Sequence, residues 1–203
     1  MDKYIIHACP KRMWYVERYL VPSMRAQGID PMVRCDHDGL GNLEFCMRIF
    51  EGMDGYGATW HLQDDVITCH DFAERTKQHT EGIVCGFLWE HAEREAKLWK
   101  SFQCIRIPDE LARGCAEWFY KRGRYLYRQL TETNAFDDCF FEYYLTDRKI
   151  NPKITKLLPN LVDHIDYLIG GTTVSFGRKY PDCRSAQFED LDLVEELKER
   201  LKE

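Results

Sequence analysis

Two adjacent aspartates are the residues whose type and spacing most directly suggest chemistry. Asp64 and Asp65 lie in the stretch Ala58–Ile67, whose apolar and β-branched residues predict a buried strand. A strand that ends in two carboxylates brings negative charge to the edge of a sheet, where a cation must neutralise it or water must solvate it. Because ligands of open α/β sheets gather at the carboxyl ends of strands, the pair predicts a divalent-metal site that a nucleotide phosphate could share. The alternative is a solvated turn.

A second predicted strand, Pro31–Cys35, ends in Asp36-His37-Asp38. In a nucleotide-binding α/β unit, a carboxylate at this place can accept hydrogen bonds from ribose hydroxyls, which makes Asp36 and Asp38 donor-site candidates. The same residues could form an ordinary turn. They could also form a metal cluster, although alternate residues of an extended chain point to opposite faces. The sequence leaves these three interpretations open.

Two further polar segments occur in the second half of the chain. Asp137 and Asp138 precede an apolar segment, 140–145, that we expect to be helical, and aspartate at a helix N-terminus is favoured by capping and by the helix dipole. His164 stands between two aspartates and could offer a neutral imidazole to a metal while a carboxylate fixes its tautomer. A histidine in an apolar string is also often a core residue, so both interpretations of His164 stay open.

The segment Leu62-Gln63-Asp64-Asp65-Val66, followed by Asp71-Phe72, resembles the Leu-Glu-Asp-Asp-Val segment and trailing Phe of glycosyltransferase family 25. More loosely, it resembles the Asp-x-Asp motif of GT-A nucleotide-sugar glycosyltransferases. In those enzymes the last Asp binds a Mn2+ or Mg2+ ion that bridges the donor diphosphate. The resemblance therefore implies Asp65 as a metal ligand and Asp64 as part of the donor site. Gln63 stands where the family has Glu, and the role of that carboxylate is not carried over.

The same resemblance implies roles for residues elsewhere in the chain. The loop after the first strand holds the nucleotide in the GT-A pattern, which makes Pro10 and Arg12 donor-site candidates; a basic surface loop is the alternative. A late His completes the metal site in several GT-A families, and His164 resembles that residue. An acidic pair at the start of a helix often serves the acceptor in these enzymes. One of Asp137 and Asp138 would then take the proton of the acceptor hydroxyl.

Strand and helix patterns alternate along the first part of the chain. The alternation predicts an α/β fold with a mainly parallel central sheet and helices on both faces, similar to GT-A and Rossmann-like folds. Pro22 should kink or divide the first helix, and Asn42 is a good N-cap for the second. A helix over 109–130 should bury the rings of Trp118 and Phe119. The predicted strands cover 4–9, 31–35, 58–67, 83–87 and 102–108, and the first three helices cover 13–28, 42–50 and 71–79.

Composition bounds the class of protein. With 203 residues, of which 44% are hydrophobic, the chain can bury a core of its own, and we expect a single domain over 1–203. Within it, residues 1–90 would bind the nucleotide sugar, and 91–203 would bind the acceptor and complete the metal site. No run of about 18 uncharged apolar residues and no signal-peptide pattern occurs, which predicts a cytoplasmic protein without a membrane span. Nine cysteines without a Cys-x-x-Cys pattern are expected to be reduced.

The formal charge of -6 argues against a broad surface that coats nucleic acid. The basic and aromatic cluster from Lys121 to Arg128 could stack on bases or form a solvated turn.

With the resemblance, these features predict a metal-dependent glycosyltransferase that uses a nucleotide-sugar donor, first of all a UDP-sugar. The acceptor would be a glycan, a protein or a modified nucleic-acid base. Two alternatives remain. A metal-dependent phosphoryl-transfer enzyme, such as a nuclease or nucleotidyltransferase, would bring both aspartate pairs to one point. A catalytically silent protein would bind nucleotide without turnover.

Overall fold

The central sheet has six strands: β1 (Lys3–Ala8), β2 (Met32–Cys35), β3 (Ala58–Gln63), β5 (Ile83–Cys85), β6 (Cys104–Pro108) and β7 (Ile154–Lys156). The computed structural model describes residues 2–88, 102–123, 125, 137–169 and 199. The strand order is β2-β1-β3-β6-β5-β7. β1 pairs in parallel with β2 and β3, β5 pairs in parallel with β7, and β6 runs antiparallel to both of its neighbours. The predicted mainly parallel sheet is confirmed.

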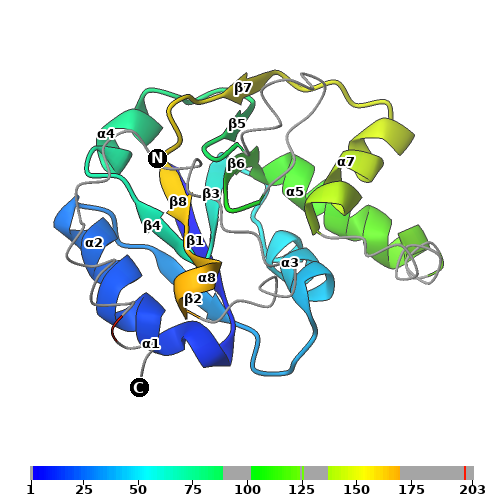
Figure 1. Cartoon of the computed structure of the whole chain (residues 1–203). Helices are drawn as coiled ribbons and strands as arrows, with labels where there is room; N and C mark the ends of the chain where they lie inside the picture. Colours follow the sequence, from blue (N-terminus) through cyan, green and yellow to red (C-terminus); the bar gives the residue numbers. More distant parts are fainter. Residues whose placement is uncertain (1, 89–101, 124, 126–136, 170–198, 200–203) are drawn as a thin grey trace.

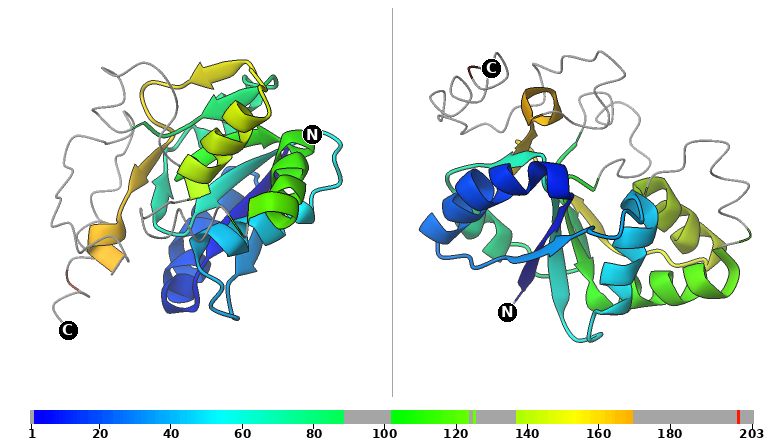
Figure 2. Two further views of the ribbon diagram at one scale, coloured as in Figure 1. Left: turned by 90° about the vertical axis from the view of Figure 1, so that its right-hand side faces the viewer. Right: turned by 90° about the horizontal axis from the view of Figure 1, so that it is seen from below.

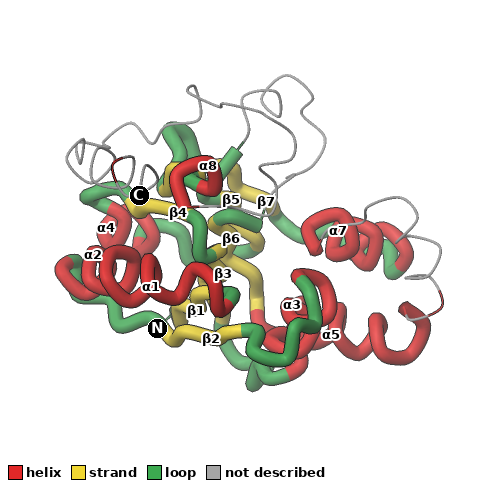
Figure 3. Tube along the Cα trace, turned by 60° about the horizontal axis from the view of Figure 1, so that its bottom comes forward, coloured by secondary structure: helices red, strands yellow, loops and turns green. Residues whose placement is uncertain are grey.

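Helices cover both faces of the sheet (Figures 1 and 2). One face carries α1 (Met13–Tyr15), α2 (Val21–Ala26) and α4 (Phe72–Lys77), and the other carries α3 (Asn42–Glu51), α5 (Asp109–Trp118) and α7 (Asp137–Asp147). Successive strand residues point to opposite faces of the sheet, so the strands contribute side chains to two separate cores. Trp60 and Leu62 of β3 pack in the first core, and Ile105 and Ile107 of β6 pack in the second. Figure 3 shows the same division of the helices. The predicted α/β architecture is confirmed.

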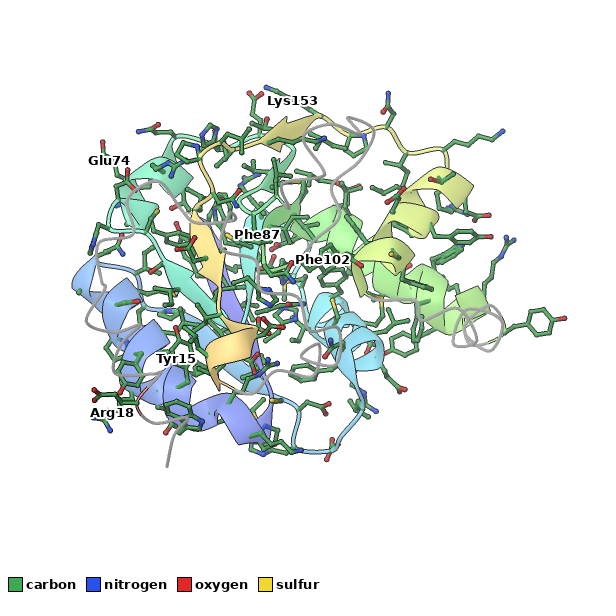
Figure 4. The ribbon with its side chains drawn as sticks, in the orientation of Figure 1. Tyr15, Arg18, Glu74, Phe87, Phe102 and Lys153 are labelled. Atoms are coloured by element: carbon green, nitrogen blue, oxygen red, sulfur yellow. The ribbon has the colours of Figure 1, made fainter. Side chains whose placement is uncertain are left out.

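Large aromatic side chains fill both cores, as Figure 4 illustrates. The labelled Tyr15 and Phe87 belong to the first core, and the labelled Phe102 belongs to the second. Tyr15 also donates its hydroxyl hydrogen to the carbonyl of Val66 at 2.8 Å, which ties α1 to the segment after β3. The predicted burial of the Trp118 ring is confirmed, because 5% of that residue is exposed.

The prediction of one strand over residues 58–67 is wrong. β3 ends at Gln63, Asp64 and Asp65 form a turn, and a new strand, β4 (Val66–Thr68), pairs with β8 (Val162–His164) in a separate two-stranded sheet. Adjacent side chains of a continuous strand would point to opposite faces of the sheet. The turn removes that constraint, and both carboxylates can then reach the same cation.

The structure bears on two helix predictions. Wider turns over Val16–Leu20 interrupt the regular helix between α1 and α2, and Pro22 lies in the first turn of α2, as expected of a proline that kinks or divides the segment. Asn42 is not an N-cap. Gly41, with a φ of 81°, takes the capping position, and Asn42 is the first residue of α3.

Other predictions fall wholly or partly outside the described residues. α5 continues as wider turns over Phe119–Gly123, and the remainder of the helix expected to reach 130 is described only at Tyr125. The boundary between the two proposed halves lies within 89–101, which is also outside the described residues. Among the described helices, none combines the length and the apolar character needed to cross a bilayer. The described cysteines are free thiols.

Candidate functional site

The carboxyl ends of β1, β2, β3 and β5 point to the same edge of the sheet. β1 and β3 are neighbours there. From β1 the chain continues to β2 on one side of the pair, and from β3 it continues to β5 on the other side. In open α/β sheets, ligands bind beyond the strand ends at such a reversal of direction. The candidate site is formed here by the segments that follow β1 and β3.

Asp64 is held from two directions. The backbone N–H of Cys9 donates to Asp64 Oδ2 at 2.7 Å, and Arg12 Nη2 lies 2.7 Å from Asp64 Oδ1. Pro10 cannot extend the ladder of β1, and the 3-10 turn Pro10–Arg12 follows it and carries the guanidinium toward the acid. Both residues of this ion pair are buried, with Asp64 1% and Arg12 8% exposed. Both oxygens of the Asp64 carboxylate therefore have a partner.

Asp65 shares the same guanidinium. Its Oδ2 lies 2.7 Å from Arg12 Nη1 and 3.3 Å from His164 Nε2. The antiparallel register of β4 and β8 sets His164 beside the aspartate turn, and the N–H of Ile165 donates to the carbonyl of Asp65 at 2.8 Å. The other ring nitrogen of His164 faces Asp166 Oδ1 at 3.7 Å. We call Arg12, Asp64, Asp65 and His164 the ion cluster.

The charges of the ion cluster depend on one another. Burial acts to raise the pKa of Asp65, but the hydrogen bond from His164 and the charges of His164 and Arg12 hold that pKa below its usual value. Burial acts to lower the pKa of His164, and the hydrogen bond and charge of Asp65 raise it overall. For Asp64, burial is the largest influence and raises the pKa to about 6, against the pull of Arg12. An imidazolium that donates to carboxylates cannot at the same time ligate a metal, so His164 would do so only in its neutral form.

One carboxylate oxygen of the ion cluster has no partner. Asp65 Oδ1 is buried and accepts no hydrogen bond, and Arg12 Nε is buried and donates none. A buried carboxylate oxygen left in this state costs free energy that a bound cation would recover. Mg2+ is usually held by one or two carboxylates together with substrate phosphates and waters, so the residues fit an ion held at Asp65 Oδ1. Within the described part of the chain, no group of three or more His, Cys, Asp or Glu side chains could hold a metal on its own.

The other donor-site candidates lie near the same edge and make different contacts. Pro10 is exposed at the start of the turn after β1. Asp36 follows β2 and accepts hydrogen bonds from the N–H groups of Leu40 and Gly41 at 2.9 Å each, so both of its oxygens close its own loop. Asp38 is exposed in that loop. A contact between ribose and Asp36 or Asp38 stays a prediction.

Asp137 and Asp138 lie in another part of the molecule. They begin α7, which packs in the second core with α3 and α5, whereas β4 and β8 pack in the first. Figure 3 shows α7 at a distance from β4 and α8 (Asp166–Ile169). Asp138 accepts a hydrogen bond from the N–H of Cys139 at 2.6 Å, and burial raises the pKa of its carboxyl. The two aspartate pairs therefore lie on segments that pack in different cores.

A histidine pair on the other face of β1 and β3 was not among the predicted site residues. His7 Nε2 and His61 Nδ1 lie 2.9 Å apart, and the second ring nitrogen of His61 is buried without a hydrogen-bond partner. Burial lowers the pKa of both imidazoles, that of His7 to about 4. The available signal was a polar ring inside each of two predicted buried strands.

No protein-family model matches the chain, and no curated protein matches it, so the resemblance to glycosyltransferase family 25 is unsupported. Several solved structures are similar to it in fold. Protein A197 from STIV is 15% identical, with 80% of this chain and 85% of that chain covered and a TM-score of 0.44. A protein from Bacillus anthracis assigned as a glucose-1-phosphate thymidylyltransferase, solved with sucrose, is 10% identical, with 77% and 86% covered and a TM-score of 0.42. A Drosophila β-1,4-galactosyltransferase 7 mutant, solved with manganese, UDP-Gal and xylobiose, is 10% identical, with 95% and 79% covered and a TM-score of 0.47. Likenesses of this size leave the activity to be argued from the residues themselves.

Proposed function

We propose that this protein transfers a sugar from a nucleotide diphosphate donor to an acceptor hydroxyl, with the help of Mn2+ or Mg2+. The observation that supports the proposal most directly is the buried turn of Asp64 and Asp65. This turn stands at the carboxyl end of β3, beside β1, where an open α/β sheet binds its ligand. Two carboxylates, one guanidinium and one imidazole are costly to bury, and a purely structural turn does not need them.

Each residue of the ion cluster has a distinct part in this proposal. Asp65 would hold the metal through Oδ1, the oxygen without a partner. The metal, when bound, supplies a Lewis acid for the charge that grows on the leaving diphosphate. His164 keeps the Asp65 carboxylate oriented and ionised, and the N–H of Cys9 does the same for Asp64. Arg12 supplies the positive charge that keeps both acids ionised within the protein.

The acceptor side of the proposal depends on Asp137 and Asp138. A general base works best when its pKa approaches the operating pH, and the pKa of Asp138 is shifted upward by burial. We propose that one of the two carboxylates accepts the proton of the acceptor hydroxyl. The attacking hydroxyl of the acceptor, a glycan, a protein or a modified base, would then lie within hydrogen-bond reach of that carboxylate, and the donor sugar would have to extend from the diphosphate at the ion cluster to the same point.

A nucleotide-binding protein without turnover is the second candidate. The contacts of Arg12 favour it, because a guanidinium that already neutralises both carboxylates leaves them less need of a metal. The phosphoryl-transfer alternative has less support, since the segments that carry the two aspartate pairs pack in different cores and the described residues contain no cluster of three metal-binding side chains.

A thermal-shift screen of UDP-, GDP- and TDP-sugars, with and without Mn2+, tests the proposal together with an assay for released nucleoside diphosphate. A donor at about 100 times its Kd should stabilise the fold by about 2.7 kcal/mol. Asp65→Asn should abolish the Mn2+-dependent part of the shift and the turnover. Asp30→Asn is the matched control, because Asp30 forms an exposed ion pair with Arg25. Nucleotide binding without release of diphosphate would support the silent candidate, and no binding of any donor would overturn both.

A further inference from the structure

The Arg12 guanidinium lies between the carboxylates of Asp64 and Asp65, where a divalent cation that binds both of them would have to lie. Nη1 and Nη2 each lie 2.7 Å from a carboxylate oxygen, one of Asp65 and one of Asp64, and the Arg12 side chain is 10% exposed. Three of the four carboxylate oxygens thus have partners, which leaves a metal the single oxygen Asp65 Oδ1. An ion that is to bind both carboxylates has to take an oxygen from Arg12.

The arrangement with Arg12 in place is incomplete on both sides. Asp65 Oδ1 is a buried acceptor without a donor, and Arg12 Nε is a buried donor without an acceptor. Each orphaned group carries a desolvation penalty, which is larger for charged groups than for neutral ones. A metal at the aspartates would satisfy the first atom, and release of the guanidinium toward a phosphate would satisfy the second. Arginine presents a planar fork of donors that matches a phosphate as well as it matches a carboxylate.

We propose that Arg12 is a built-in cation that competes with a divalent ion for the carboxylates of Asp64 and Asp65. The inference rests on the proposed function, since it assigns a regulatory part to the same site. Without a donor, Arg12 holds the acids and the ion binds weakly. A donor diphosphate pairs with the displaced guanidinium, so donor and ion each strengthen the binding of the other by the same factor.

The test measures Mn2+ binding alone, without any nucleotide, by the electron paramagnetic resonance signal of free Mn2+. Arg12→Met keeps an apolar stem of similar length and removes the charge. Its affinity for Mn2+ should be at least about tenfold higher than that of the wild-type protein. The gain should disappear in Arg12→Met/Asp65→Asn. Arg25→Met is the control, because Arg25 pairs with Asp30 on the surface and should leave Mn2+ affinity at the wild-type value.

A folded Arg12→Met protein that binds Mn2+ no more tightly than the wild type would overturn the inference. If Arg12→Met folds only with Mn2+ present, the metal has replaced the guanidinium and the inference is supported. If it does not fold at all, Arg12→Lys decides. A lysine is a point charge that pairs with one carboxylate at a time. It should raise Mn2+ affinity by a smaller factor, and wild-type affinity in this variant would count against competition.

These outcomes are separable from those of the proposed function. If Arg12→Met binds Mn2+ more tightly but the wild-type protein neither hydrolyses nor transfers a nucleotide sugar, the transferase proposal is overturned and the competition stands. Conversely, normal transfer with unchanged Mn2+ affinity in the Arg12 variants would retain the transferase and remove the competition.

Discussion

On its two faces, the β1–β3 pair buries ionisable groups in opposite ways. On the side of the first core, the ion cluster keeps its charges by pairing them, and the pKa of His164 is raised by Asp65. On the side of the second core, His7 and His61 pack against Phe45 and Phe50 and lose their charges, since burial lowers both pKa values. The comparison shows that burial alone does not decide the charge of a histidine; a carboxylate within reach does.

The largest effect should come from removing the one guanidinium that both aspartates share. Arg12→Ala leaves two buried carboxylates without their cation, and we expect the free energy of unfolding to fall by about 3 to 5 kcal/mol. Urea unfolding at neutral pH measures it. Arg25→Ala breaks an exposed ion pair of Arg25 and Asp30 and should cost at most about 1 kcal/mol. Equal losses in the two variants would show that the ion cluster is no more important to stability than a surface pair.

The second largest effect should come from the histidine pair, through its influence on stability at low pH. The pKa of His7 falls from 6.5 in the unfolded chain to about 4 in the folded protein. Between these pH values the unfolded chain binds more protons than the folded protein, so His7 lowers the free energy of unfolding as the pH drops. Above pH 6.5 it has no such effect. When the pH is lowered from 7.5 to 4, the free energy of unfolding of His7→Leu should therefore rise by up to about 3 kcal/mol relative to that of the wild type. The difference between the two proteins is the quantity to follow, because the raised pKa of Asp64 acts in the opposite direction over part of this range.

The smallest effect should come from His164, with the opposite sign. Its folded-state pKa is raised, so its contribution to stability is fully present below the unfolded pKa of 6.5 and is lost as the pH rises through the folded value. His164→Gln should remove about 1.5 kcal/mol of stability at pH 6 and less at pH 9. Unfolding curves at both pH values check this. A loss that grows toward alkaline pH would mean that His164 is neutral in the folded protein, like His7 and His61.

The sequence predicts much of the fold because its signals are local. The apolar run before Pro10 and the run Pro31–Cys35 predict β1 and β2, and the helical period around Leu43 and Phe50 predicts α3. The antiparallel direction of β6 is not readable in this way, because period-2 alternation is the same for either direction of pairing. The N-cap at Gly41 was missed since a side-chain cap is the commoner choice and the residue beside it could have supplied one.

By itself, the sequence determined that two adjacent acids follow a buried strand at an edge of an α/β sheet, and that a histidine lies among aspartates much later in the chain. Only the tertiary structure decided which groups pair with those carboxylates. Arg12 and Asp65 are 53 positions apart, and His164 reaches Asp65 through the pairing of β4 with β8. Propensity and periodicity act over a few residues, whereas the partner of a buried charge is set by which segments the folded chain brings within a few ångströms.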